Sequence, residues 1–526
     1  MTAASAHSSL FRASRRRHWL CIAYAFPPVN RSGTHRTLAF VRHLHDLGWD
    51  ATVLTVDPMH EPLDESLLDR VPSNATIIRT PWRDLIAWLK LLRFPTRTRG
   101  QSHSTDRSSS RQSAIGNRQS LRERVSRLLI TPDSRIGWLP FAVRAGLKAI
   151  RGRRPDVIYS TSPYMSAHLI ALVLHHGTRI PWVADFRDPW VDNPFRNLSF
   201  PILKAWDSFL EWLVLRSASR VVCNTATMAE AFRRRRPWVA RKCTTILNGI
   251  DRDLLSEVTA VRITSSKDFV FTHCGQFYGP RSPCVWFAAL ARIRRESPKI
   301  ADRIHLLLIG GEAYNGRPLA EWASEAGVGD QVHIAGWKCH AEALSKMAGS
   351  DALILSAPSG TGGDRQVPNK LFEYLGLQRP LIAAVPKGSP IVAILRAARA
   401  DAICCPPDDE RAIADAIVAL VVRPESAATD LWSGVHRFDR VHRAVELVEL
   451  FRRIARSPRP ASGRVLAACT RPAQSTLPTS SRGPLDPVEY EGVGTAFASD
   501  GGLRPVTGED AGIVGQGHQI VAEVPH

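Results

Sequence analysis

Short apolar runs alternate with longer segments whose apolar residues recur at helical spacing along most of the chain. Residues 22–25 form the first run, and in residues 33–48 Leu38, Val41 and Leu44 recur every three or four positions before a closing glycine. A β-branched run follows at 51–56. This order predicts strand–helix–strand units, in which parallel strands pack between helices. Further strands of this series are predicted at 157–160, 182–185, 220–223 and 245–247.

A second series of the same kind begins near Asp268. Its predicted strands are 269–273, 305–309, 332–334, 352–355, 381–384 and 402–404, with helices between them that include 285–296 and 342–347. Each series is long enough for one domain with its own core, at about 200 residues. We therefore expect an α/β protein with two doubly wound, Rossmann-like parallel-sheet domains that face a cleft.

The pattern also predicts the limits of these domains. The expected boundaries are 1–17 for a basic arm, 18–245 for the N-terminal domain, 246–428 for the C-terminal domain, 429–456 for a last helix and 457–526 for a tail. Residues 96–120 are rich in Ser, Arg and Gln, and the tail is rich in Gly, Pro and Ser. Because neither stretch has apolar periodicity, we expect both to be disordered.

The amino-acid composition limits the classes of binding partner and the cellular compartments that fit this protein. The net charge of +20 attracts polyanions such as a nucleotide diphosphate, an anionic lipid or a nucleic acid. The nine cysteines form no metal-binding spacing, and an odd number favours a reducing compartment. The apolar stretch after the basic arm ends in Pro27-Pro28 rather than at a signal-peptide cleavage site. We expect a cytoplasmic protein.

The segment VPNKLFEYLGLQRPL (367–381) carries the most informative chemistry. It predicts a helix that opens at Pro368-Asn369, with Lys370 and Glu373 in its first turns. Amide donors at a helix N-terminus together with a lysine suit a diphosphate. A glutamate one turn further along can accept hydrogen bonds from a ribose. The alternative is an ordinary amphipathic helix that faces the core.

Two loops at predicted strand ends are candidate phosphate contacts. HCGQFYGPRSP (273–283) contains Gly275 in a glycine loop and Arg281 just before a helix start, where a guanidinium can bind phosphate with two hydrogen bonds. FPPVNRSGTHR (26–36) offers Ser32 as a helix cap and Gly33 for close backbone approach to a ligand. The alternatives are a surface arginine and a routine strand-to-helix loop.

A third candidate lies at the end of another predicted strand. ADFRDPW (184–190) brings Asp185, Arg187 and Asp188 to the carboxyl edge of a parallel sheet, which is the edge where ligands bind in open α/β sheets. A catalytic or acceptor-binding role is one interpretation, and a structural ion pair is the other.

These segments, in this order, resemble the retaining glycosyltransferases of family 4, which have the GT-B fold. The remaining matching segments are TILNGID (245–251), LLLIGG (306–311), VHIAGW (332–337) and FDRVHRAVELVELF (438–451). The resemblance covers about residues 19–456. It implies a hexosyltransferase-like enzyme whose C-terminal domain binds a nucleotide-diphosphate sugar, whose N-terminal domain holds the acceptor, and whose last helix crosses back to the N-terminal domain.

The resemblance also implies roles for individual residues. The residues implied in catalysis are Arg281, Lys370, Asp185 and Asp188, of which the first two would meet the diphosphate and the last two would face the reacting sugar. The residues implied in donor binding are Gly33, Gly275, Arg281, Asn369, Lys370 and Glu373, with Glu373 on the ribose. On the acceptor side the resemblance implies Arg31, Ser32 and Arg187.

Two positions depart from the family pattern. Arg365 stands where the family usually has a glutamate, and Trp286 stands where it often has a lysine. The sequence contains no convincing Asp-x-Asp metal motif, so we expect no metal and no cofactor beyond the nucleotide-sugar substrate. Transfer with retention implies that the acceptor attacks from the face that the diphosphate leaves.

The acceptor is expected to be a glycan or a lipid-linked molecule. RDLIAWLKLLRF (83–94) is a basic amphipathic segment that suits an anionic membrane surface, although a core-packed helix is the alternative. The Trp-rich segment 203–215 is predicted to be a helix packed in the core. We therefore expect peripheral contact with the inner face of a membrane as a further property.

Three other functions remain open from the sequence. A sugar-nucleotide 2-epimerase would share the fold and the nucleotide site but use no acceptor. A non-catalytic scaffold of the GT-B fold would explain Arg365 and Trp286. A basic nucleic-acid-binding protein would explain the charge, but the chain has no reader motif, so we expect no nucleic-acid partner.

Overall fold

The computed structural model describes eight parts of the chain, residues 16–58, 61–83, 131–191, 193, 201–265, 267–357, 366–423 and 431–456. Four predictions therefore concern segments that lie wholly or mostly outside the described residues. These are the basic arm 1–17, the insert 96–120, the amphipathic segment 83–94 and the tail 457–526. Arg365 also lies outside them.

The first half of the chain forms a seven-stranded parallel sheet with the strand order β3-β2-β1-β4-β5-β6-β7. Its strands are β1 Arg17–Ala23, β2 Trp49–Val56, β3 Thr76–Thr80, β4 Val157–Thr161, β5 Trp182–Phe186, β6 Arg220–Cys223 and β7 Cys243–Thr245. The central strands are apolar on both faces because helices cover both faces. β3 escaped the sequence analysis because only one of its five residues is buried.

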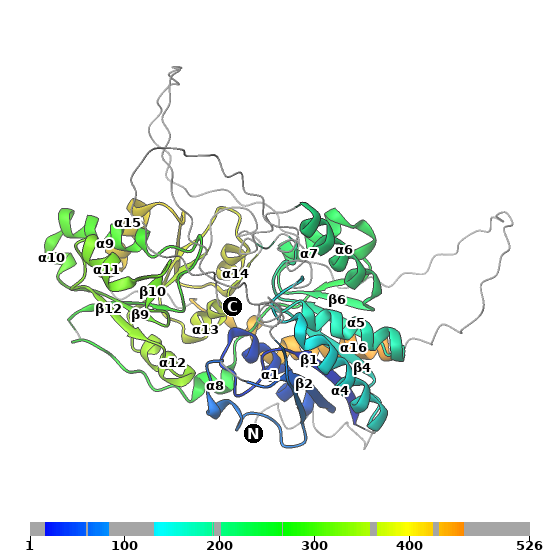
Figure 1. Cartoon of the computed structure of the whole chain (residues 1–526). Helices are drawn as coiled ribbons and strands as arrows, with labels where there is room; N and C mark the ends of the chain where they lie inside the picture. The colour runs from blue at the N-terminus through cyan, green and yellow to red at the C-terminus, as the bar shows by residue number, and fades with distance from the viewer. Residues whose placement is uncertain are drawn as a thin grey trace, which may run out of the picture. The chain divides into compact units, whose positions relative to one another are not determined.

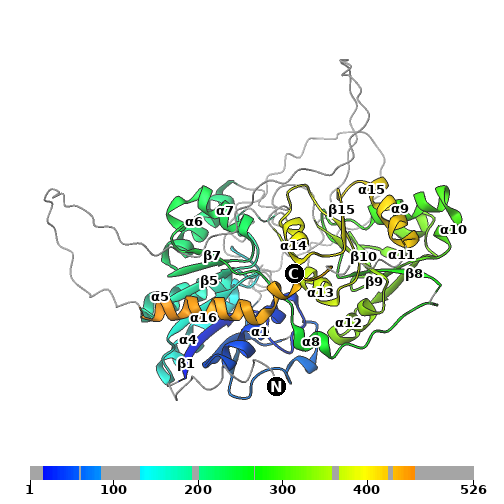
Figure 2. The same cartoon turned by 180° about the vertical axis from the view of Figure 1, so that it is seen from behind.

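Alternate residues of β1 pack into different layers of helices, as the period of two in a strand requires. Leu20 and Ile22 join a core with helices α4 Leu139–Gly152 and α5 Ser166–Thr178. Trp19 and Cys21 join a core with α1 Ser32–Asp46 and α16 Arg440–Arg456. Figure 1 shows α4 and α5 beside β1 and β4, and Figure 2 shows α16 running alongside α1. Within the described residues of this half, the other α-helices are α6 Pro201–Ser217 and α7 Ala226–Arg235.

The second half forms a six-stranded parallel sheet with the order β12-β9-β8-β13-β14-β15. Its strands are β8 Phe269–Cys274, β9 Ile304–Ile309, β12 Val332–Gly336, β13 Ala352–Ser356, β14 Leu381–Ala384 and β15 Ala402–Cys405. The helices around it are α9 Cys284–Glu296, α10 Pro298–Ala301, α11 Leu319–Glu325, α12 His340–Ala348, α13 Lys370–Leu377, α14 Pro390–Ala398 and α15 Glu410–Val422. A two-stranded hairpin of β10 Ala313–Tyr314 and β11 Arg317–Pro318 is attached.

The two-sheet α/β fold predicted from the sequence is confirmed. The chain passes from one sheet to the other between Thr245 and Phe269, through the short helix α8 Arg252–Ser256. In both sheets the loops with candidate chemistry follow the carboxyl ends of strands β1, β5 and β8.

Helix α6 differs from its prediction as a core helix. Leu203, Leu210 and Val214 are buried, but Ile202, Trp206 and Phe209 on the opposite side are 60, 40 and 45% exposed. The prediction for 203–215 was therefore only half right, because helical periodicity identifies an apolar face without showing what covers it.

Candidate functional site

The loop after β8 and the start of α13 bring Lys370 against Gly275. Gly275 has a φ of +129°, which favours glycine, and a Cβ at this position would collide with Nζ of Lys370. A second close contact fixes the loop, because a Cβ on Gly310 would lie 2.7 Å from the carbonyl oxygen of Gly275. The loop conformation therefore depends on glycines that leave room for the ammonium group.

His273 holds the Lys370 ammonium from the other side. Nδ1 of His273 lies 3.3 Å from the carbonyl oxygen of Ile354, to which it donates, so Nε2 is free to accept from Lys370 Nζ at 3.4 Å. Burial and the neighbouring Lys370 hold the pKa of His273 well below its usual value, which keeps the ring neutral. Its ring stacks on Phe277 with centroids 4.2 Å apart.

Arg281 adds a second cation to this edge of the sheet. Nη1 of Arg281 donates to the hydroxyl of Tyr278 at 3.1 Å, and the guanidinium lies over the same ring, 5.1 Å from its centroid. Burial lowers the pKa of Lys370 to about 8, and the positive charge of Arg281 contributes in the same direction. Two neighbouring cations, Arg281 buried and Lys370 partly buried, that repel each other in this way favour binding of an anion with more than one charge.

Glu373 lies one turn into α13. Its Oε1 is 3.2 Å from Nε2 of His340 and 3.3 Å from Nδ2 of Asn369. Burial alone would raise the pKa of Glu373, but His340, with smaller contributions from His35 and Arg440, outweighs burial and brings the pKa to about 2. Because the amide nitrogen of Asn369 faces Glu373, its Oδ1 points elsewhere and is buried without a hydrogen-bond partner among the described residues. The start of α13 thus presents the ionised carboxylate of Glu373 next to the unused acceptor Oδ1 of Asn369.

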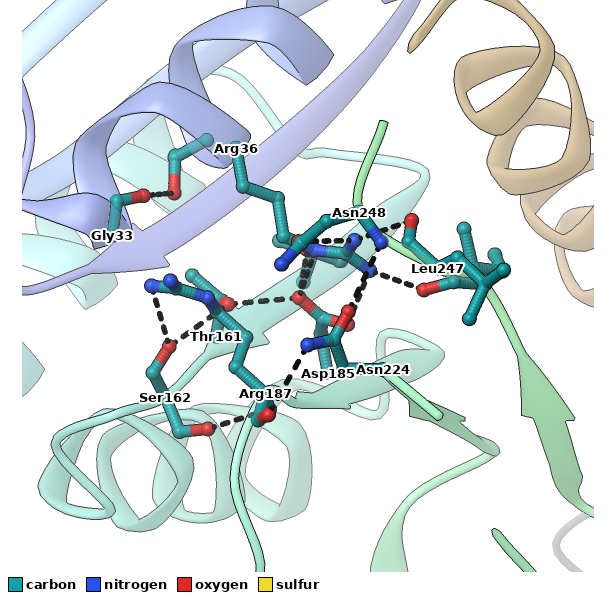
Figure 3. A network of polar contacts seen from close by, with 12 residues as sticks. Gly33, Arg36, Thr161, Ser162, Asp185, Arg187, Asn224, Leu247 and Asn248 are labelled. Carbon is teal, nitrogen blue, oxygen red and sulfur yellow. Dashed lines mark hydrogen bonds and ion pairs between the residues drawn. The ribbon is translucent and has the colours of Figure 1, made fainter. Parts of the chain in front are cut away.

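A second polar network lies at the carboxyl edge of the first sheet (Figure 3). Asp185 at the end of β5 forms a two-pronged ion pair with Arg36 of α1, with contacts of 3.0 and 3.1 Å. Tyr159 and Thr161 donate to the same carboxylate at 2.6 and 2.8 Å. Burial raises the pKa of Asp185, but the charge of Arg36 and the hydrogen bonds from Arg36, Tyr159 and Thr161 together bring it below its usual value, so the carboxylate stays ionised.

Arg36 also fastens the segment that leads to the second sheet. It donates to the carbonyl oxygens of Ile246 and Leu247 at 2.9 and 2.8 Å, and to Oδ1 of Asn248 at 3.0 Å. All five N–H groups of this guanidinium are thereby used. The carboxylate of Asp185 is 0% exposed and forms a buried ion pair.

The other residues expected near this edge have different surroundings. Arg187 is 8% exposed, and its guanidinium lies beneath the start of α1, where a Cβ on Gly33 would be 2.7 Å from Nη1. Asp188 is partly exposed. Arg31 is paired with Glu61. The predicted cap at Ser32 is wrong, because Arg31 occupies the N-cap and makes no side-chain capping bond.

One of the two departures from the family pattern has a structural explanation. Trp286 is buried in the core beside the second sheet, and its Nε1 donates to Oγ of Ser356 at 2.7 Å. It therefore serves packing, which the sequence analysis did not foresee.

Sequence reasoning missed several residues of these networks, among them His273, His340 and Arg36. His273 and Arg36 lie inside quoted motifs, and only the contacts across the sheet edges reveal their roles. His340 opens α12, and its ring contacts that of His35 of α1 in a tilted arrangement with centroids 4.2 Å apart. No local pattern marked it.

Comparison with known proteins gives two domain matches. Residues 103–254 match the model of Glycosyltransferase Family 4, and residues 268–422 match that of Glycosyl transferases group 1. No curated protein matches the chain.

Several solved structures are similar to this one. HepE of Anabaena, solved in complex with UDP, is 14% identical, with a TM-score of 0.51 over 83% of this chain and 100% of that chain. Sucrose-phosphate synthase from Thermosynechococcus elongatus is 18% identical, with a TM-score of 0.55 over 84% of this chain and 99% of that one. At these identities the similarity establishes the fold.

Proposed function

Because the chain is a family 4 glycosyltransferase with the GT-B fold, we propose that it moves a sugar from a nucleoside-diphosphate donor to a glycan or lipid-linked acceptor. The observation that carries the proposal is the Lys370 ammonium, held against Gly275 with Arg281 close enough to lower its pKa. This pair of cations would bind the diphosphate.

The same cations would act during the reaction. When the bond between the sugar carbon and the diphosphate breaks, negative charge develops on the leaving phosphate. We propose that Lys370, Arg281 and the amide groups at the start of α13 would stabilise this charge in the transition state. HepE of Anabaena, which has the same fold, has been solved with UDP and with UDP-glucose, in support of this ligand class.

Glu373 and Asn369 would hold the nucleoside. An ionised carboxylate accepts hydrogen bonds from the two hydroxyls of a ribose, and His340 and Asn369 fix its orientation through Oε1. The unused Oδ1 of Asn369 is a further acceptor for a ligand hydroxyl. Leaving such a buried acceptor without a partner destabilises the protein unless a ligand or water occupies the position.

Transfer would proceed with retention and without a metal. The acceptor oxygen would bond to the sugar carbon from the face that the diphosphate leaves, and a phosphate oxygen of the leaving group would take the acceptor's proton. No dedicated protein base is then required. Among the described residues no group of three or more potential metal ligands is gathered, whereas two cations are available for the leaving group. Turnover should persist in excess EDTA. If EDTA abolished turnover and added Mg²⁺ restored it, the proposal of metal-independent transfer would be refuted.

The first sheet would hold the acceptor. We assign residues 18–245 to the acceptor side, 246–428 to the donor side and 429–456 to the helix that returns to the first domain. Arg31, Ser32, Arg187 and Asp188 remain candidates for acceptor contacts. Because Asp185 is enclosed by Arg36, Tyr159 and Thr161, we propose that it positions the β5 edge and does not itself contact the reacting sugar.

An anionic membrane surface is a proposed partner of the same domain. Ile202, Trp206 and Phe209 form an exposed apolar row on α6, and the rings of Trp206 and Phe209 stack with centroids 5.5 Å apart. Aromatic and aliphatic groups of this kind insert between lipid headgroups. No helix within the described residues is long and apolar enough to span a bilayer, so contact through a surface is the route we propose.

Basic residues contact the same helix. Nη2 of Arg236 donates to the carbonyl oxygen of Ser208 on α6 at 3.2 Å, and Nζ of Lys242 donates to that of Arg216 at 2.7 Å. Residues 201–242 contain nine Lys or Arg and three Asp or Glu, so their net charge is +6. Two of the three carboxylates, Asp207 and Glu211, are buried, so the accessible surface is still more basic.

Sedimentation with vesicles of an anionic phospholipid tests this surface. Trp206→Ser with Phe209→Ser should abolish co-sedimentation, while Val441→Ser with Val445→Ser, which changes two exposed residues of α16, should not. Equal binding of both double variants would refute the assignment.

The donor site is tested by binding and turnover together. Thermal-shift screening of nucleoside-diphosphate sugars identifies the donor, because a ligand that binds only the folded state raises the melting temperature. Lys370→Ala and Glu373→Ala should remove most donor binding and turnover, with losses on the order of 100-fold in rate, whereas Lys299→Ala on the exposed surface should match wild type. Full activity of both site variants would refute the proposal.

Two alternatives have distinct outcomes in the same experiment. A 2-epimerase would convert the sugar nucleotide when incubated alone, which product analysis detects. A non-catalytic scaffold would bind the nucleotide without turnover with any acceptor.

A further inference from the structure

Two cysteines contact each other at the outer edge of the first sheet. Sγ of Cys223 lies 3.4 Å from Sγ of Cys243. Cys223 is the last residue of β6, and Cys243 is the first residue of the edge strand β7. The register pairs Val221 with Cys243, so the period of two in a strand puts both cysteines on the same face of the sheet. The fold therefore brings together two thiols that lie 20 residues apart in the chain.

The contact makes the two thiols chemically unequal. The pKa of Cys223 is raised well above its usual value by burial and by its hydrogen bond to Cys243. The same bond lowers the pKa of Cys243, and the positive charge of Arg233 acts in the same direction. These opposite directions are expected when Cys223 donates the bond and Cys243 accepts it. Because the thiolate is the reactive form of cysteine, Cys243 is the nucleophile of the pair.

Cys243 is also the thiol nearer to solvent. It is 7% exposed and precedes the exposed Thr244, whereas Cys223 is 0% exposed and lies behind it. A reactive thiol near the surface with a second thiol directly behind it is the usual arrangement of an attacking and a resolving cysteine.

Cys21 provides an internal comparison. It is buried at 0% exposure in the other core layer of the same sheet, and burial raises its pKa. Its thiol makes no contact with another sulfur among the described residues. Cys21 has the environment of an inert cysteine that packs as a small apolar group, and the pair at the sheet edge differs from it in both contact and pKa.

We propose that Cys223 and Cys243 form an oxidation site at which a hydroperoxide converts the two thiols to a disulfide. The Cys243 thiolate attacks one peroxide oxygen, the O–O bond breaks, and a sulfenic acid forms while the leaving oxygen takes a proton. The sulfur of Cys223 then attacks the sulfenic sulfur, so the S–S bond forms as the S–O bond breaks. The proton of Cys223 leaves with that oxygen as water. The two thiols thus supply the two electrons that reduce the peroxide.

The disulfide would tie the edge strand to its neighbour. An S–S bond is about 2.05 Å long, so the two sulfurs have to approach by about 1.3 Å, which side-chain rotation can supply. Asn224, directly after Cys223, accepts a hydrogen bond from the amide of Asn248 at 3.0 Å (Figure 3). The bond would therefore form beside the segment that leads to the second sheet. In a reducing compartment such a disulfide is transient, as expected for a redox-responsive site.

The first experiment uses the reduced wild-type chain and hydrogen peroxide. After oxidation the protein is unfolded in iodoacetamide, digested without reductant and analysed by mass spectrometry. The peptides of Cys223 and Cys243 should be joined, and dithiothreitol should separate them. Cys21 should remain alkylated, and the exposed Cys339 should react at least about tenfold more slowly than Cys243. Full alkylation of Cys223 and Cys243 after Cys339 has been oxidised would overturn the proposal.

Two variants test the order of attack. In Cys223→Ala the sulfenic acid on Cys243 has no resolving thiol, so dimedone should label Cys243 there and not in wild type. In Cys243→Ala the Cys223 thiol should stay reduced. Oxidation of Cys223 at the wild-type rate in Cys243→Ala would overturn the proposal. Circular dichroism checks that both variants are folded, and the experiment on wild type depends on neither.

A final comparison tests whether the fold is responsible. The oxidation is repeated with the wild-type chain unfolded in urea, where the two sulfurs are no longer held in contact. The yield of the joined Cys223 and Cys243 peptides should fall at least about tenfold, because contact in the folded protein raises the effective concentration of one thiol near the other. An equal yield in folded and unfolded protein would overturn the proposal.

Discussion

The pH dependence of donor binding offers a direct test of the role given to Lys370. Burial and Arg281 lower the pKa of this lysine to about 8 in the unliganded protein, and a bound diphosphate would raise it. The ammonium form binds the diphosphate, so affinity is present below pH 8 and is lost as the pH rises through 8. Affinity falls with rising pH because the ligand is an anion and the ammonium form attracts it.

The size of the expected change in affinity follows from the same pKa of Lys370. With a pKa of about 8, about nine-tenths of the lysine is protonated at pH 7 and about one-tenth at pH 9. The dissociation constant for UDP should therefore rise about tenfold between pH 7 and pH 9, or ~1.4 kcal/mol. At pH 8 each UDP that binds should carry about half a proton into the protein.

Isothermal titration calorimetry in buffers of different ionisation enthalpy measures both quantities. Lys370→Arg is the matched control, because guanidinium stays charged throughout this range, so its profile should be flat and its proton uptake near zero. Any titration of UDP itself affects both proteins alike. A wild-type affinity that is constant from pH 7 to pH 9, or an equal slope in Lys370→Arg, would refute the reasoning.

Three further predictions concern stability and loop geometry. Arg36→Met should lower the free energy of unfolding by about 3–5 kcal/mol in urea titrations, because the Asp185 carboxylate loses its counter-charge, and adding Asp185→Asn should restore much of the loss. Glu373 has a pKa of about 2, so its contribution is present above its unfolded pKa and is lost as the pH falls toward 2. The stability gap between wild type and Glu373→Gln, on the order of 1–3 kcal/mol near pH 6, should therefore shrink in acid, and a gap independent of pH would contradict this account. Gly275→Ala should weaken UDP binding at least about tenfold, because its Cβ collides with Lys370 Nζ at a positive φ, and unchanged affinity in the same calorimetric assay would contradict it.

Local patterns predicted most strands and their order along the chain. β6 and β14 coincide with the predicted ranges, and most others differ by a residue or two at their ends, since apolar runs flanked by loops are a local signal. β3 was missed because its residues are mostly half-exposed. The exposed row on α6 was missed for a related reason, because periodicity defines a face but not its neighbour.

For the candidate site too, local motifs predicted some residues and only the fold revealed the others. The sequence indicated that Lys370, Arg281 and Glu373 belong to strand-end and helix-start positions, because those motifs are contiguous. It left Asp185 open between catalysis and an ion pair. Its partner lies 149 residues earlier in the chain, and only the arrangement of β1, β4 and β5 side by side brings α1 over that carboxylate.

What the sequence determined by itself was the alternation of strands and helices and the residue types at their junctions, because these depend on spacing along the chain. The tertiary structure decided which charges are paired. The strand order pairs Asp185 with Arg36 and leaves Arg187 without a carboxylate partner among the described residues. It also brings the Lys370 ammonium against Gly275 and His340 next to Glu373. Pairing depends on distance in space, and residues far apart in sequence become neighbours only when the sheet order is fixed.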